Sequence, residues 1–196
     1  ELVLSGLDKL IVSMDGTTQE VYEQYRKGGK LTKAIEGVQH INKCKKEIKS
    51  ITPLVEIQFI VLKTNEHQMK EMKTLAKSLK ADRMVFKSAQ LYDFENGNDL
   101  LTSFEKYSRY KKTNDGKYKV KNALPNHCSR LWSAAVISSK GDLIPCCYDK
   151  DGTHSFGNLA DRSFSSVWHS SKATEFRMSV LSNSKQHEMC RNCTGK

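Results

Sequence analysis

Six cysteines carry the chemistry that this sequence offers most clearly. They stand at positions 44, 128, 146, 147, 190 and 193 of a chain of 196 residues. Uneven spacing in a chain that shows no export signal argues against a disulfide framework and favours metal binding or redox use. Cys190 and Cys193 form a C-x-x-C pair, the spacing at which one tight turn directs two thiolates at one metal centre. This pair needs two further ligands.

A β-hairpin is expected to supply them. The stretch "AAVISSKGDLIPCC" predicts two short strands that turn at Lys140-Gly141. Pairing of the strands brings Cys128, before the first strand, and Cys146, after the second, to the same end. Neighbouring residues of a strand point to opposite faces, so Cys147 is expected to be a buried small hydrophobe or a nearby sulfur rather than a ligand. The expected ligands are Cys128, Cys146, Cys190 and Cys193.

The identity of the metal stays open on spacing alone. Four thiolates suit either a zinc ion or an iron–sulfur cluster. Unligated core cysteines are the plain alternative, which is weak for Cys190 and Cys193 because their tail is polar, but open for Cys128. Cys44 lies on an apolar helical stripe and is expected in a core.

A parallel sheet with crossover helices is expected upstream of the cysteine site. Residues 9–14, 54–62 and 82–87 are apolar runs that predict strands, and helical patterns over 31–48 and 65–79 separate them. Strands alternating with helices predict parallel βαβ units, whose functional residues gather at the carboxyl ends of the strands. The fold class is therefore α/β.

Polar residues are expected to mark the ends of the helices. Thr17 followed by Glu20 is a capping box, and Gly28 ends the short helix that it begins. Asn65 is expected to cap the helix after the second strand, and Asp15 to shape a turn. Beyond the hairpin, "SFSSVWHSSKATEFRMSVL" predicts one or two helices with these residues inward: Val167, Trp168, Phe176, Val180 and Leu181.

The positive charge of the chain is local. The formal net charge is +10, and residues 101–150 hold 10 Lys and Arg against 4 Asp and Glu. The densest part, 105–121, mixes seven basic residues with three tyrosines, a composition that attracts phosphate or an acidic peptide. A solvated connector explains the same run of charge.

Membrane insertion is not expected. No apolar run approaches the roughly 20 residues of a membrane-spanning helix, and the chain has no recognisable leader, so a cytoplasmic location is predicted. Because the first residue is Glu1 and a strand pattern follows almost at once, we expect the chain to begin inside a larger protein.

Several motifs together resemble one enzyme family. "VSMDGTTQEVYEQYRKGGKLTKAIEGV" and "IQFIVLKTNEHQM" are similar to the fourth and fifth strands, with their following helices, of radical S-adenosylmethionine enzymes. Cys128, twelve residues, Gly141, four residues and Cys146, followed by "FGNL", "SVW" and C-x-x-C, resemble the SPASM or twitch extension of those enzymes. That extension holds auxiliary iron–sulfur clusters, so the resemblance favours iron–sulfur over zinc.

The resemblance implies a fold and a division of the chain. The fold would be the C-terminal part of a partial (βα) TIM-like barrel plus a small α+β SPASM/twitch domain. The barrel part would take 1–90, a basic connector 91–122 and the cluster domain 123–196. The family's C-x-x-x-C-x-x-C motif and the first barrel strands are absent, so this chain alone is not expected to start radical chemistry. We expect one auxiliary cluster, because the chain has no cysteines beyond the C-x-x-C.

The resemblance also implies residues that face S-adenosylmethionine. Ser13 and Asn65, at the ends of two strands, would face the cofactor, and Arg26 would bind its carboxylate as a fork. Each has a plainer explanation: Ser13 as a small strand residue, Arg26 as a solvated helix-end cation and Asn65 as a helix cap.

The parent enzyme is accordingly expected to be a radical S-adenosylmethionine oxidoreductase or maturase. Its 5′-deoxyadenosyl radical would take a hydrogen atom from a peptide or small-molecule substrate, and an auxiliary [4Fe-4S] cluster would accept an electron or ligate substrate. The missing N-terminal half of the barrel is an expected partner, and the exposed strand 9–14 predicts self-association. The alternative is a non-catalytic four-cysteine zinc module with a basic nucleic-acid-binding stretch, although nucleic acid is the less expected partner.

Overall fold

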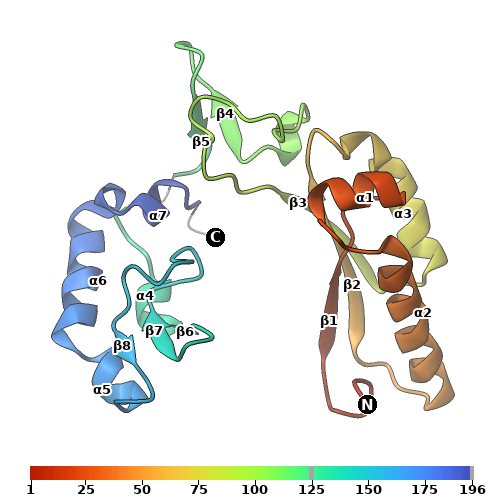
Figure 1. Cartoon of the computed structure of the whole chain (residues 1–196), viewed down its shortest axis with the longest axis horizontal. Coiled ribbons are helices and arrows are strands. Elements are labelled where there is room, and N and C mark those ends of the chain that lie inside the picture. Colours follow the sequence, from red (N-terminus) through yellow and green to blue (C-terminus); the bar gives the residue numbers. More distant parts are fainter. Residues whose placement is uncertain (124–125, 195–196) are drawn as a thin grey trace. The chain divides into compact units, whose positions relative to one another are not determined.

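The computed structural model divides the chain into two compact units. It describes residues 1–123 and 126–194, and the units are Glu1–Lys119 and Val120–Lys196 (Figure 1). Each unit has its own hydrophobic core.

A three-stranded parallel sheet forms the centre of the N-terminal unit. Its strands are β1 (Lys9–Ser13), β2 (Leu54–Val61) and β3 (Arg83–Ser88), in the order β1-β2-β3. Val12 lies beside Ile57, and Ile57 beside Met84. The alternation of β2 places Val55, Ile57, Phe59 and Val61 in the core. The predicted strands and their parallel pairing are thus confirmed.

Helices pack against one face of this sheet, as Figure 1 shows for α2 and α3. The helices are α1 (Gln19–Tyr25), α2 (Leu31–Glu47), the 3₁₀ turn η1 (Glu66–Gln68) and α3 (Met69–Ser78). Val38 and Ile41 of α2 and Met72 of α3 meet the buried side chains of β2. Apolar residues at helical spacing therefore explain why these segments cover the sheet.

Three expectations for this unit are wrong in detail. The cap of α1 is Thr18, whose hydroxyl accepts from the amide of Val21, because Thr17 instead donates its amide to Gln68. Asn65 does stand at the N-cap position of η1, but its side chain makes no capping hydrogen bond within the described residues. Cys44 is half-buried and lies 3.6 Å from His40 Nε2, outside the core.

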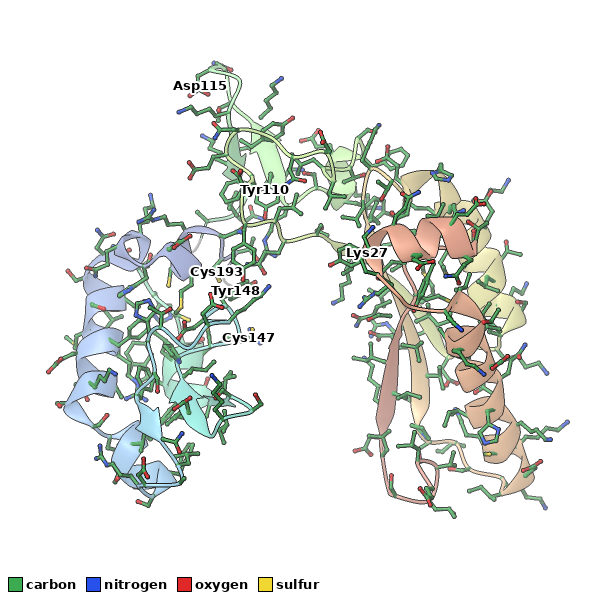
Figure 2. All side chains as sticks on the ribbon, in the orientation of Figure 1. Lys27, Tyr110, Asp115, Cys147, Tyr148 and Cys193 are labelled. Atoms are coloured by element: carbon green, nitrogen blue, oxygen red, sulfur yellow. The ribbon has the colours of Figure 1, made fainter. Side chains whose placement is uncertain are left out.

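The basic segment after the sheet is folded rather than a bare solvated connector. It contains η2 (Glu105–Tyr107) and a hairpin of β4 (Tyr110–Lys112) and β5 (Tyr118–Val120). Tyr110, labelled in Figure 2, stacks on Phe94 with ring centres 4.4 Å apart, and its hydroxyl bonds the backbone of Leu91. The lysines of the two strands lie on the exposed side.

The C-terminal unit combines a small sheet with short helices. Its antiparallel strands are β6 (Val136–Ile137), β7 (Asp142–Ile144) and β8 (Gly157–Asn158), in that order. Its helices are α4 (Arg130–Ser133), α5 (Phe164–Trp168), α6 (Ser171–Asn183), η3 (Ser184–Gln186) and α7 (Glu188–Arg191). The hairpin turns at Gly141, whose φ of +85° suits glycine. Both the hairpin and the pair of helices confirm the sequence-based expectation.

The core of this unit lies between α6 and the small sheet. Leu143, Phe156 and Val167 pack against Phe176 and Val180. Leu181 was expected inward but is 38% exposed, because the buried face of α6 follows positions 173, 176, 177 and 180. No helix among residues 1–123 and 126–194 is long and apolar enough to span a bilayer. The chain is a mixed α/β protein with a parallel sheet.

Candidate metal centre

Four of the six cysteines stand at the ends of elements of the C-terminal unit. Cys128 precedes α4, and the amide of Leu131 donates to its carbonyl oxygen at 3.2 Å. Cys146 follows β7, and its carbonyl oxygen accepts from the amide of Asp149. Cys190 lies in α7, and the amide of Cys193 bonds back to its carbonyl oxygen at 3.1 Å. That last bond is the tight turn expected of C-x-x-C.

The four thiols lie near enough to affect one another electrostatically. Burial, followed by the neighbouring thiols of Cys146, Cys193 and Cys128, raises the pKa of Cys190 to about 12. Burial also raises the pKa of Cys146, and its neighbours Cys147 and Cys193 act in the same direction. Without a metal these two groups are neutral thiols at pH 7, and metal binding would release their protons.

The donor set of the site is thiols alone, which suits either a zinc ion or an iron–sulfur cluster. Within the described part of the chain, no group of three His, Cys, Asp or Glu side chains is arranged to hold one ion.

Cys147 differs from its neighbour. It is exposed, whereas Cys146 is half-buried, and Figure 2 shows its side chain apart from that of Cys193. Cys128 and Cys190 pack against the core of the unit. The expectation of a buried Cys147 is therefore wrong, whereas the alternative of a nearby sulfur agrees with its electrostatic influence on Cys146.

Asn126 links the segment that leads to Cys128 with the segment that leads to Cys190 and Cys193. It was not identified from the sequence. Its Oδ1 accepts from the amide and hydroxyl of Ser184 at 2.9 and 3.0 Å, and its Nδ2 donates to the carbonyl of Ser182. Ser184 begins η3, which leads into the helix of Cys190. Only its place two residues before Cys128 hints at this role.

The residues expected to face S-adenosylmethionine lie at the carboxyl ends of β1 and β2. Ser13 ends β1, and within the described residues its hydroxyl has no hydrogen-bond partner. Arg26 Nε donates to Asp15 Oδ2 at 2.6 Å, while the terminal nitrogens of Arg26 have no hydrogen-bond partner among the described residues. Arg26 is thus held at one edge of its guanidinium, rather than being a freely solvated cation.

Asn65 and Asp15 are buried and connect the carboxyl ends of β1 and β2 through hydrogen bonds to the backbone. Asn65 is 1% exposed; its Nδ2 donates to the carbonyls of Asp15 and Ile60, and its Oδ1 accepts from the amide of Leu62. Asp15 is fully buried, and its Oδ1 accepts from the amide of Ile60 at 2.6 Å. Asp15 therefore does more than shape a turn. A buried acid between two strand ends was not distinguishable in sequence from an ordinary Asp-Gly turn.

Glu66 fastens the loop that follows the sheet to the end of β2. Its carboxylate accepts from Thr102, Ser103 and Lys63. Burial alone would raise the pKa of Glu66, but the hydrogen bonds from Ser103, Thr102 and Lys63 lower it to about 2. Glu66 is therefore ionised at pH 7 and engaged with this loop.

The comparisons with known proteins agree with the cysteine pattern. Residues 128–194 match the SPASM family, described as an iron-sulfur cluster-binding domain. The S-adenosyl-L-methionine-dependent 2-deoxy-scyllo-inosamine dehydrogenase of Niallia circulans is 30% identical over 60 residues, which are 30% of this chain and 24% of that protein. The match thus spans about a quarter of the relative's length.

Two solved structures of BtrN are also similar. One is in an open conformation and the other is in complex with AdoMet and 2-DOIA; their identities are 14% and 17% and their TM-scores 0.32 and 0.33. Each covers 82% of this chain, which spans 63% and 65% of theirs. TM-scores of this size do not establish a shared fold.

Residues 128–194 of the C-terminal unit thus match an iron-sulfur cluster-binding domain, over part of the chain. The resemblance of the chain to the C-terminal part of radical S-adenosylmethionine enzymes is confirmed. This match favours iron–sulfur over the zinc alternative.

Proposed function

We propose that the C-terminal unit binds one auxiliary [4Fe-4S] cluster through Cys128, Cys146, Cys190 and Cys193. The observation that carries the proposal is that these four thiols all lie in residues 128–194, which match an iron-sulfur cluster-binding domain. When bound, the cluster supplies one-electron chemistry or a site that ligates substrate. The protein supplies the thiolates and the partly buried surroundings of the site.

In this proposal the N-terminal unit is the later part of a partial (βα) barrel. Ser13, Arg26 and Asn65 lie at the carboxyl end of the sheet, where parallel α/β folds bind ligands. The free terminal nitrogens of Arg26 would take the carboxylate of S-adenosylmethionine as a bidentate pair. Asn65 would act indirectly, since its side-chain nitrogen and oxygen already bond the backbone.

The proposed enzyme is a radical S-adenosylmethionine oxidoreductase or maturase that acts on a peptide or small molecule. The exposed lysines of β4 and β5 would suit an acidic substrate. A cytoplasmic location is proposed with it, because the six cysteines are all free thiols.

Anaerobic reconstitution with iron and sulfide tests the cluster. We expect the chain to take up about four iron and four sulfide ions and to gain broad visible absorption with an EPR signal on reduction. A chain that instead binds one zinc ion and no iron would contradict the proposal. Such a result would favour the alternative, a non-catalytic zinc module.

A second proposal concerns β1 and the part of the barrel that would precede it. Among the described strands β1 pairs only with β2, and Ile11 is 49% exposed. A groove of about 580 Å³ lies beside β1, with Leu10 and Val12 on one side and Val38 and Ile41 of α2 on the other. A preceding strand and helix would cover this edge in the parent enzyme.

Alone, the chain is therefore expected to self-associate at the free edge of β1. Light scattering should show an average mass above 22.3 kDa that falls towards it when Ile11 is replaced by Lys. Replacing the exposed Ile51, which lies outside the strands, by Lys is the control. A monomer at all concentrations would contradict this proposal.

A further inference from the structure

An arginine lies inside the core of the C-terminal unit. Arg177 is 7% exposed and occupies the buried face of α6, between Ala173 and Val180. No acidic side chain pairs with it within the residues described. A buried cation without an acidic partner is costly, so an apolar residue would be the simpler choice at this position.

The guanidinium spans three elements of the unit. Nε donates to the carbonyl of Leu131 at 2.9 Å, and Nη1 donates to the carbonyl of Trp168 at 2.8 Å. The same group lies 4.3 Å from the centre of the Trp168 ring and 5.7 Å from that of Phe156. Arg177 thus joins α6 to α4, to the end of α5 and to the residue before β8, elements that neighbour one another in Figure 1.

One of these contacts leads directly to a cysteine. Leu131 accepts from Arg177 through its carbonyl and donates through its amide to the carbonyl of Cys128 at 3.2 Å. The residues from Cys128 to Leu131 form a single turn, so Arg177 fixes the far end of the turn that Cys128 begins. The Nη2 of Arg177 is buried without a hydrogen-bond partner among the described residues. This position therefore keeps two directed hydrogen bonds at the expense of one unsatisfied donor.

The second contact, with Phe156, links Arg177 to the strand that leads to Cys146. Phe156 lies under the guanidinium, and its amide donates to the carbonyl of Leu143 in β7, the strand that leads to Cys146. A single side chain thus contacts the turn of Cys128 directly and the strand that leads to Cys146 through Phe156. An apolar residue would fill the same space but would not orient either segment.

We propose that Arg177 is a positioning residue of the cysteine centre, which holds Cys128 in place relative to the other three thiols. This inference rests on the proposed cluster site and adds a residue that does not touch the cluster. Arg177 acts through Leu131, so its effect depends on the presence of the Cys128 thiol.

The test compares how fast reconstituted chains lose iron to a chelator under anaerobic conditions. Arg177→Met is expected to lose iron about 10–100-fold faster than wild type, the range usual for residues that support metal ligands. Arg177→Lys keeps the charge but cannot donate in the two directions of a guanidinium. Its rate of iron loss is expected to lie between those of wild type and Arg177→Met. Arg162→Met is the matched control, because Arg162 is exposed and its partner among the described residues is Ser166 of the neighbouring turn.

A double-mutant cycle separates positioning from a general role in stability. The Cys128→Ser background is compared by the residual iron content after reconstitution, because stable uptake needs all four thiolates; there Arg177→Met should change that content less than about twofold, since the ligand that it positions is gone. An equal effect in both backgrounds, or no effect in the wild-type background, would overturn the inference. Failure of both Arg177 variants to fold would also overturn it, since Arg177 would then serve the fold as a whole.

Failure of the proposed cluster site gives a different result from failure of the positioning role of Arg177. A wild-type chain that takes up no iron and sulfide would overturn the cluster site, and the role of Arg177 with it. A wild-type chain that takes up the cluster but is indifferent to Arg177→Met would overturn only the positioning role.

Discussion

Cys146→Ala is expected to abolish stable uptake of the cluster, whereas Cys147→Ala is expected to leave it intact. Cys146 is half-buried, and burial raises the pKa of its thiol, while Cys147 is exposed and lies apart from Cys193 in Figure 2. Removing one of four thiolates should weaken iron binding more than the roughly 100-fold that supporting residues cost. Iron and sulfide content after anaerobic reconstitution, with the visible absorption of each variant, measures the difference.

The variants Cys146→Ala and Cys147→Ala serve as controls for each other. Both substitutions remove one sulfur from the same loop, so a general loss of thiols or of loop structure would affect them equally. If Cys147→Ala loses the cluster and Cys146→Ala keeps it, the assignment of the ligand is reversed. If neither loses it, the set of four ligands is wrong.

Hydrophobic periodicity was sufficient to predict the sheet. The strands, the helices α2 and α3 and the hairpin before Cys146 all carry local patterns of buried residues, and all are present. Local pattern dictates these elements because each must bury one face against its neighbours. It does not fix side-chain partners, which is why the cap of α1 was placed at Thr17 instead of Thr18.

The roles of polar residues whose partners lie far away along the chain could not be predicted from the sequence. Arg177 shares the helical spacing of Phe176 and Val180, but its charge argues for a surface position. Only the structure shows that the carbonyls of Leu131 and Trp168 accept hydrogen bonds from it. The same holds for Asn126, whose partners lie 56 and 58 residues away. The ligand set Cys128, Cys146, Cys190 and Cys193 could be proposed from sequence because the residue type limits what it can do, and it stays a prediction, whereas an arginine or asparagine takes its role from distant partners.

The largest loss of stability is expected in the N-terminal unit from Asp15→Ala. Asp15 is fully buried and joins the amide of Ile60 to the guanidinium of Arg26, so removal leaves a buried donor unsatisfied and a cation without its partner. We expect a cost of about 2–4 kcal/mol. Asp15→Asn keeps an oxygen for the amide of Ile60 but not the ion pair, and should cost less. Asp8→Ala, at an exposed position before β1, is the control.

Two probes can assign the loss to one unit, because both tryptophans, Trp132 and Trp168, lie in the C-terminal unit. Hydrogen exchange at the amide of Ile60 should become about 30–1,000-fold faster in Asp15→Ala, the ratio that 2–4 kcal/mol corresponds to when exchange follows opening of the unit. Unfolding in urea followed by tryptophan fluorescence should stay as in wild type. Unchanged exchange at Ile60 would mean that the carboxylate of Asp15 does not hold the two strand ends together, and the support proposed for Arg26 would then be lost as well.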